Sequence, residues 1–360
     1  MKKLTVKRVL SLLMAGTFVL AGATACNKTP SGDGSQGGSG GETLNVGALV
    51  STVGIPAIYA EEKGYFDEAG LDVNIIIFPT GAPVNEAIAA KQIDVACSGF
   101  ASVYSMANAD CSWIADINST GGIGLYARPD SDIAKATTEV DGLTFYGSAD
   151  TVKGAQVLEP LGTSAQFITE CYVEKLGLTG TDVNQVHMEY GPGFQAFVAG
   201  EGDILSVSPP YSYDCLDKGY VEIASFEDAT GVEMMDGCFA RNDILESRSE
   251  DVKTFLKVLV KAMDELQDED VRFDYTINKY HENAQEFTDE NMRKEIADRK
   301  YMGTEFISQS DYVMGEAWLP ISEFLVDVGK ITEDAQPNVV KNINPSILSE
   351  VTGLDIKGVS

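Results

Sequence analysis

Three short polar breaks interrupt the apolar segments between residues 43 and 100. They are Ser51-Thr52, Thr80-Gly81 and Ser98-Gly99. A hydroxyl group can donate and accept hydrogen bonds, and glycine lets the backbone approach a bound molecule closely. The three breaks therefore favour contact with a small polar molecule. The same residue types are also common turn formers, so a purely structural role is the alternative.

The segments between these breaks predict alternating strands and helices. Thr43 to Val50 alternates like an opening strand, residues 71–77 form a near-continuous apolar strand, and Ile93 to Cys97 form a third. Pro56 suits the first turn of the first helix, and Gly64 can end it in a left-handed conformation. Repeated strand–helix units predict a parallel α/β sheet, which binds ligands beyond the carboxyl ends of its strands. The three breaks would then face one crevice.

A second group of small polar residues follows a later strand. Residues 155–161, AQVLEPL, predict a short strand, and Gly162-Thr163-Ser164 come directly after it. Thr163 or Ser164 can cap the helix that begins there, whose apolar face continues to Leu176. Helix amides that point into a cleft favour an anion. We expect this turn to contact a ligand, although capping alone would also explain it.

Three aromatic residues and one arginine complete the candidate binding site. Phe100 follows Ser98-Gly99, Tyr190 ends the segment that begins at Val183, and Tyr211 follows Ser208-Pro209-Pro210. They can supply apolar or stacking walls, or they can belong to the core. Arg241 can hold an acidic ligand by a forked contact, or it can pair at the surface with Asp243.

The first 42 residues have the composition of an export leader and a tether. An apolar run from Val9 to Ala21 follows a basic start and is too short for a stable membrane span. Small residues then precede Cys26, as they do where a lipoprotein cysteine is lipidated. The following segment is rich in Gly and Ser and predicts a flexible linker. We expect a signal peptide at 1–25 and a lipidated linker at 26–42; a plain secretory signal with a chance cysteine is the alternative.

Composition and cysteine spacing argue against several classes of function. The 360-residue chain has 26 basic and 55 acidic residues and a formal net charge of −29. Phosphate backbones require clustered Lys and Arg, so nucleic-acid binding is not expected. The six cysteines match no zinc pattern. A Cys97–Cys111 bridge is possible in an exported protein, but mostly separate buried thiols are expected. No metal or cofactor is predicted.

Several segments together resemble one family of transport proteins. EKGYFDEAGLDVNI, a glycine loop and AIAAKQIDVACSG occur in the first hundred residues, and AFVAGEGDILSVSPPY follows later. This order resembles the substrate-binding proteins of ABC importers in the nitrate, sulfonate, taurine and thiamine-precursor group (NMT1/THI5-like), from residue 43 to about residue 330. Two departures are the extra residues before Gly154 and Ser208 in place of an aromatic residue, which weakens a sulfonate assignment.

The resemblance implies an α/β, two-lobed periplasmic-binding-protein-like fold of type II. Each lobe would be a mainly parallel sheet flanked by helices, and two strands would form the hinge. Lobe 1 is expected at 43–128 and 237–360, and lobe 2 at 129–236.

The function that the resemblance implies is capture of a small molecule without turnover. A monomeric lipoprotein on the outer face of the bacterial cytoplasmic membrane would deliver this molecule to an ABC permease and its ATPase. A ligand-sensing lipoprotein without a transporter is the first alternative. A pyrimidine-synthase-like enzyme is the second, and it is disfavoured because His187 and His281 are the only histidines and no nucleophile-elbow or metal-ligand motif occurs.

Overall fold

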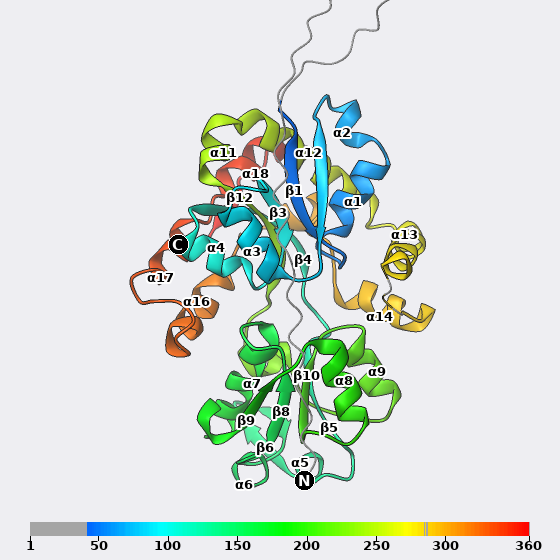
Figure 1. Ribbon diagram of the computed structural model, residues 1–360, viewed down its shortest axis with the longest axis vertical. Helices are drawn as coiled ribbons and strands as arrows, with labels where there is room; N and C mark the ends of the chain where they lie inside the picture. The colour runs from blue at the N-terminus through cyan, green and yellow to red at the C-terminus, as the bar shows by residue number, and fades with distance from the viewer. Residues whose placement is uncertain (1–41, 284, 286, 360) are drawn as a thin grey trace, which may run out of the picture. The chain divides into compact units, whose positions relative to one another are not determined.

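The computed structural model describes residues 42–283, 285 and 287–359, which form two five-stranded sheets flanked by helices (Figure 1). The expected signal peptide, Cys26 and most of the linker lie outside the described residues. No helix within the described ranges is long and apolar enough to cross a membrane.

The first sheet contains the three strands predicted from the start of the chain. Its order is β2-β1-β3-β12-β4, with β1 parallel to both β2 and β3, and β12 antiparallel to both β3 and β4. The strands are β1 (Leu44–Leu49), β2 (Val73–Phe78), β3 (Val95–Ser98), β4 (Cys111–Ser119) and β12 (Met235–Arg241). Connecting helices are α1 (Ile55–Glu62), α2 (Tyr65–Glu68), α3 (Gly81–Ala89) and α4 (Ser102–Asn108). We call this sheet and its helices lobe 1.

Local sequence explains how the first helices begin and end. Pro56 lies in the first turn of α1, where a missing N–H leaves no hydrogen bond unmade. Gly64, at φ 73°, adopts the left-handed conformation that separates α1 from α2. The long helix α12 (Ser249–Glu265) is amphipathic, and its Phe255 ring stacks on Phe66 with ring centroids 5.5 Å apart. This contact joins α2 to α12.

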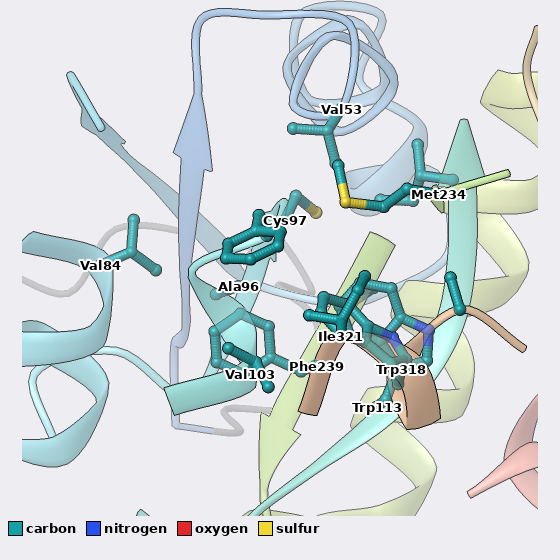
Figure 2. Packing of buried hydrophobic residues seen from close by; sticks show 14 of the residues in the cluster. Val53, Val84, Ala96, Cys97, Val103, Trp113, Met234, Phe239, Trp318 and Ile321 are labelled. Carbon is teal, nitrogen blue, oxygen red and sulfur yellow. The ribbon is translucent and has the colours of Figure 1, made fainter. Parts of the chain in front are cut away.

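The core of lobe 1 is centred on two buried indoles. Trp113 of β4 and Trp318 pack edge to face with ring centroids 4.9 Å apart, and Figure 2 shows Ile321 beside them. Trp318 belongs to the C-terminal part of the chain, so this part completes the core of lobe 1. That part comprises α11 (Asn242–Ser247), α13 (Glu269–Glu282), α14 (Asp289–Asp298), α15 (Thr304–Ile307), β13 (Val313–Met314), α16 (Trp318–Asp327), α17 (Gln336–Lys341), α18 (Pro345–Thr352) and β14 (Lys357–Gly358).

The second sheet has the order β11-β5-β10-β8-β9 and one antiparallel strand, β5. We call it, with its helices, lobe 2. Its strands are β5 (Gly124–Ala127), β8 (Gln156–Glu159), β9 (Asn184–His187), β10 (Ile204–Val207) and β11 (Val221–Ser225). Its helices are α7 (Ser164–Lys175), η1 (Gly180–Asp182), α8 (Tyr190–Val198), α9 (Tyr211–Asp217) and α10 (Phe226–Thr230). The extra residues noted before Gly154 form α5 (Asp132–Lys135), the hairpin β6 (Thr137–Val140) and β7 (Leu143–Tyr146), and α6 (Ala149–Val152).

The chain enters lobe 2 earlier than predicted. The expected boundary at residue 128 is wrong because β5 belongs to the second sheet, between β10 and β11. The sequence shows that 124–127 is a strand, but its partners lie about 80 to 100 residues later and leave no local signal. The return strand β12 begins at Met235, two residues before the expected boundary. Both connections between the lobes meet where the Thr120 amide and hydroxyl donate to the Met234 carbonyl, at 3.0 and 2.9 Å.

Candidate functional site

A cavity of about 830 Å³ is lined by loops of both lobes. Lobe 1 contributes residues 49–51, 79–82 and 98–101, which follow the carboxyl ends of β1, β2 and β3. Lobe 2 contributes residues 160–164 and 208–211, which follow β8 and β10. Small-molecule sites typically enclose 300–1,000 Å³ and often lie at the carboxyl ends of parallel strands. The cavity therefore has the size and position of a ligand cleft.

Most of the predicted site residues meet on this cleft. The lining includes Ser51, Thr80, Gly81, Ser98, Gly99, Phe100, Gly162, Thr163, Ser164, Tyr190 and Tyr211. The six residues of lobe 1 come together because β1, β2 and β3 are parallel, so that their carboxyl ends share one edge of the sheet. Their part in binding a ligand stays a prediction.

Thr52 does not line the cleft, contrary to the expectation. Its side chain is buried, and its hydroxyl donates to Glu295 Oε1, which also accepts the Tyr280 hydroxyl at 2.7 Å. Neighbouring residues of a loop can face opposite ways, and here Ser51 turns to the cleft while Thr52 turns to α13 and α14. Thr52 therefore ties the first loop to the C-terminal helices.

Arg241 lies at the other end of the sheet. Its guanidinium pairs with Asp94 at 3.3 Å and with Asp243 at 2.9 Å. Because β12 runs antiparallel to β3, the last residue of β12 lies beside the residue that precedes β3. That edge is opposite to the cleft, so the structure supports the ion-pair alternative for Arg241.

Asp236 is a cleft residue that sequence reasoning missed. It lies in β12, and its carboxylate reaches the backbone of Gly99, where a Cβ atom would fall 2.2 Å from Oδ1. Burial raises the pKa of Asp236 to about 6, while Arg299 and Asn118 lower it. Nothing local in EMMDGC marks this residue, because its position depends on pairing with strands more than 100 residues earlier.

Arg299 is the second cleft residue without a sequence signal. Its side chain is 7% exposed; Nε donates to the Gly121 carbonyl at 3.0 Å, and Nη2 donates to Ser208 Oγ at 2.8 Å. The guanidinium therefore joins the segment just after α14 to the lobe connection and to lobe 2. In the sequence Arg299 directly follows a segment rich in charged residues, which predicts an exposed helix. The burial of Arg299 therefore cannot be predicted from its local sequence.

Aromatic side chains form the lobe 2 wall of the cleft. Tyr211 packs on Phe194 with ring centroids 5.4 Å apart. Burial raises the pKa of Tyr190, while the neighbouring Ser164 and Thr163 side chains lower it. Tyr190 therefore faces the helix start at Thr163 as a neutral phenol.

Thr163 caps α7, as the sequence predicts. Its hydroxyl accepts the Ala165 amide at 3.2 Å and donates to the Pro160 carbonyl at 2.7 Å. Phe100 serves two purposes, since it lines the cleft yet is buried, with its ring 6.0 Å from that of Phe167 in lobe 2. The capping and the ligand-contact interpretations of these residues are compatible.

The Ser98 hydroxyl lacks a hydrogen-bond partner among the residues that the structure describes. Its Oγ is buried and has no hydrogen-bond partner within residues 42–283, 285 and 287–359. A Cβ atom on Gly81 would lie 3.3 Å from this oxygen, so the glycine keeps the space beside it open. An unpaired buried hydroxyl is costly, and a bound molecule could satisfy it.

The two histidines hold structural positions. The Leu161 amide donates to His187 Nδ1 at 3.1 Å, and His281 Nε2 lies 3.0 Å from the Phe287 carbonyl oxygen. His187 lines the cleft, where it supports the 160–164 loop. Across the described part of the chain, no group of three or more His, Cys, Asp or Glu side chains is arranged to hold a metal ion.

Comparison with known proteins identifies relatives of the same architecture. A protein of Brachyspira hyodysenteriae whose name places it among ABC transporter periplasmic binding proteins is 28% identical over 350 residues, covering 96% of this chain and 98% of that protein. The periplasmic aliphatic sulphonate binding protein SsuA from Escherichia coli superposes with a TM-score of 0.67 at 13% identity, over 85% of this chain and 93% of that one. The desulfurization enzyme DSZB shares the fold, with a TM-score of 0.59 at 13% identity over 87% and 99% of the two chains. Residues 51–270 match the family described as NMT1/THI5 like. The chain is a member of the NMT1/THI5-like family.

Proposed function

We propose that this protein is an extracytoplasmic solute-binding lipoprotein that captures a small molecule between its lobes and delivers it to an ABC importer. The observation that carries the proposal is the 830 Å³ cleft, whose walls come from loops of both lobes beside two connecting segments. The name of the Brachyspira relative supports the transport assignment. The partners would be an ABC permease and its ATPase, and the protein would act as a monomer.

Ligand capture would proceed by hinge closure. Within the described residues, two connecting segments link the sheets near Thr120 and Met234. The lobes can rotate about these segments when contacts that bridge the lobes rearrange, such as the packing of Phe167 on Phe324 with ring centroids 4.5 Å apart. The Tyr104 hydroxyl already lies 3.5 Å from the Gly162 carbonyl oxygen across the cleft. A ligand that contacts both lobes would favour the closed state by its differential affinity for that state.

A melting assay tests the function directly. The first compounds to screen are sulfonates, taurine, nitrate-like anions, aminopyrimidines and amino acids. A broad metabolite library is screened next. A true ligand raises the melting temperature with its concentration and is recovered unchanged. Consumption of the molecule would favour an enzyme, the class to which DSZB belongs. The absence of any shift across the library would overturn the capture function, and binding without a partner permease would favour a sensing lipoprotein.

The hydroxyl of Ser98 offers a test of the cleft. For a ligand found in the screen, Ser98→Ala is expected to weaken binding about 5- to 10-fold, because a neutral hydrogen bond contributes about 1 kcal/mol. Since Ser98 Oγ has no partner in the described protein, the ligand-free stability should not fall.

Ser102→Ala is the matched control for Ser98→Ala. Ser102 Oγ is also buried without a partner in the described ranges, but Ser102 does not line the cleft. Titration calorimetry should show unchanged affinity for this control. Equal affinities for both variants would mean that Ser98 does not contact the ligand.

The lipid anchor makes a separate prediction at Cys26. Cys26→Ser is expected to move the protein from the membrane fraction to the soluble fraction and to abolish labelling by a fatty-acid probe. One acyl chain alone binds membranes only marginally, so full retention needs the intact lipoprotein modification. Membrane retention of Cys26→Ser with labelling elsewhere would contradict the assignment.

A further inference from the structure

The charges on the cleft are mostly negative. Among the described residues that line it, Glu189, Asp214 and Asp236 carry carboxylates, whereas Arg299 alone carries a permanent positive charge. The net charge of the whole chain, −29, adds to the same field. Walls of low dielectric concentrate such a field and favour ligands of opposite sign. An anionic ligand would meet three carboxylates and one guanidinium.

The positive charge of Arg299 is already engaged by the protein. Two of its nitrogens donate to Gly121 and Ser208, and Glu295 is the larger of the two negative charges that act on it, ahead of Asp236. Glu295 itself is buried and accepts the Thr52 and Tyr280 hydroxyls. Arg299 is thus built into the contact between the C-terminal segment and the lobe connection.

Asp236 has an unused acceptor that faces the cleft. Asn118 Nδ2 reaches Oδ2 at 3.5 Å, and no hydrogen bond to Oδ1 comes from any residue that the structure describes. Gly99 leaves the room in which Oδ1 lies, because any larger residue would meet this oxygen. The unpaired Ser98 hydroxyl belongs to the same wall. A partly buried carboxylate with an open oxygen is an acceptor for a donor that the protein does not supply.

We infer that the ligand carries a positively charged nitrogen whose N–H group is accepted by Asp236, with an apolar or aromatic body against Tyr190 and Tyr211. This inference rests on the proposed capture function and names the class of ligand for the same cleft. Charge-assisted hydrogen bonds of this kind are about twice as strong as neutral ones. The aromatic wall can hold a planar body by stacking and can add cation–π attraction.

Three probes of the same shape and different charge test the inference. Benzamidinium, benzamide and benzoate are titrated into the full-length protein, with binding followed by calorimetry and by the melting temperature. Benzamidinium is expected to bind at least about tenfold more tightly than benzoate, as a charge-assisted hydrogen bond requires. Benzamide should fall between them. Stronger binding of benzoate, or no binding of benzamidinium, would overturn the inference.

Variants of Asp236, Glu189 and Gly99 distinguish a direct contact of the ligand with the Asp236 carboxylate from attraction by the overall negative charge of the cleft. Asp236→Asn is expected to weaken the binding of benzamidinium at least about tenfold. The same variant should bind benzoate more tightly than the wild type does. Glu189→Gln is the matched control, because it removes the same charge from an exposed side chain on the cleft rim and should change affinity less than about threefold. Gly99→Ala keeps the charge but displaces the carboxylate, since its Cβ would fall 2.2 Å from Oδ1. It should therefore reproduce the loss seen with Asp236→Asn.

The outcomes distinguish failure of the inference from failure of the capture function. Equal losses of benzamidinium affinity in Asp236→Asn and Glu189→Gln would mean that only the overall negative charge of the cleft attracts the probe. This result would overturn the role of Asp236. A library anion that binds tightly and is strengthened by Asp236→Asn would overturn the ligand class and leave the capture function standing. Unfolding scans without probe verify that each variant retains its cooperative transition.

Discussion

Replacing Trp113 by alanine is expected to remove about 4 to 8 kcal/mol from the free energy of unfolding. The indole is fully buried in β4 and packs on Trp318, and truncation of a buried Trp costs about 3–5 kcal/mol. Its Nε1 also donates to Asp116 Oδ1 at 2.7 Å. Loss of that donor leaves a buried carboxylate with weaker support, which adds about 1–3 kcal/mol. Native domains are stable by only about 5–15 kcal/mol, so this variant approaches unfolding.

Trp113→Phe separates the two contributions. A phenyl ring retains most of the packing on Trp318 but cannot donate to Asp116, so a loss of about 1–3 kcal/mol is expected. Asp116 keeps the Tyr312 hydroxyl at 2.9 Å and the Gly315 amide at 3.2 Å. Urea unfolding of both variants measures the difference. A loss below about 2 kcal/mol for Trp113→Ala would show that the core around β4 repacks.

The cleft of lobe 1 could be predicted because its determinants are local. A polar break after an apolar strand indicates where that strand ends, and parallel strands place such ends together. Ser51, Thr80 and Ser98 reach the cleft for this reason. The breaks do not specify which way each neighbouring residue turns, and Thr52 turns inward to Glu295 instead. Turn direction depends on packing against α13 and α14, which lie more than 200 residues later.

The direction of β12 explains both the absence of Arg241 from the cleft and the presence of Asp236 there. The sequence predicts that the chain returns to lobe 1 at residue 237, but a strand's own residues do not state whether it runs parallel or antiparallel to its neighbours. Because β12 is antiparallel to β3, Asp236 lies beside Gly99 at the cleft and Arg241 lies beside Asp94 at the far edge. Five residues of strand separate these two by about 16 Å. The end of β12 at the cleft therefore presents a carboxylate that can accept hydrogen bonds, and the arginine lies at the opposite end.

The stability of the protein is expected to fall as the pH rises from about 5 to 8, because of Glu159. This carboxyl at the end of β8 is 1% exposed, and burial raises its pKa to about 8, against a hydrogen bond from Thr169 that lowers it. Its Oε1 has no hydrogen-bond partner within the described ranges. In the unfolded chain the same group ionises near pH 4.5. The folded state therefore holds a proton that the unfolded state has released.

The sign follows from proton linkage. Where the folded state binds more protons, raising the pH favours unfolding, so the stabilising contribution of Glu159 is fully present below about pH 4.5 and is lost progressively until the folded carboxyl ionises near pH 8. At pH 7 the difference is about 3 kcal/mol for this group, from about 1.4 kcal/mol for each pKa unit. Asp116 and Asp236 act in the same direction, but their pKa values are raised only to about 6. The interval from pH 7 to 8 therefore reports mainly on Glu159.

Glu159→Gln should remove the slope between pH 7 and 8 and leave, below about pH 6, only the part of the slope that Asp116 and Asp236 contribute. The amide cannot ionise, and any cost of its additional N–H donors is the same at every pH. Glu170→Gln is the matched control, because it removes a less buried carboxylate from α7 that contributes to the raised pKa of Glu159. Urea unfolding at half-unit steps of pH measures both slopes. Parallel curves for wild type and Glu159→Gln would show that Glu159 is ionised in the fold, and the cleft loop at 160–164 would then follow a buried negative charge in place of a neutral acid.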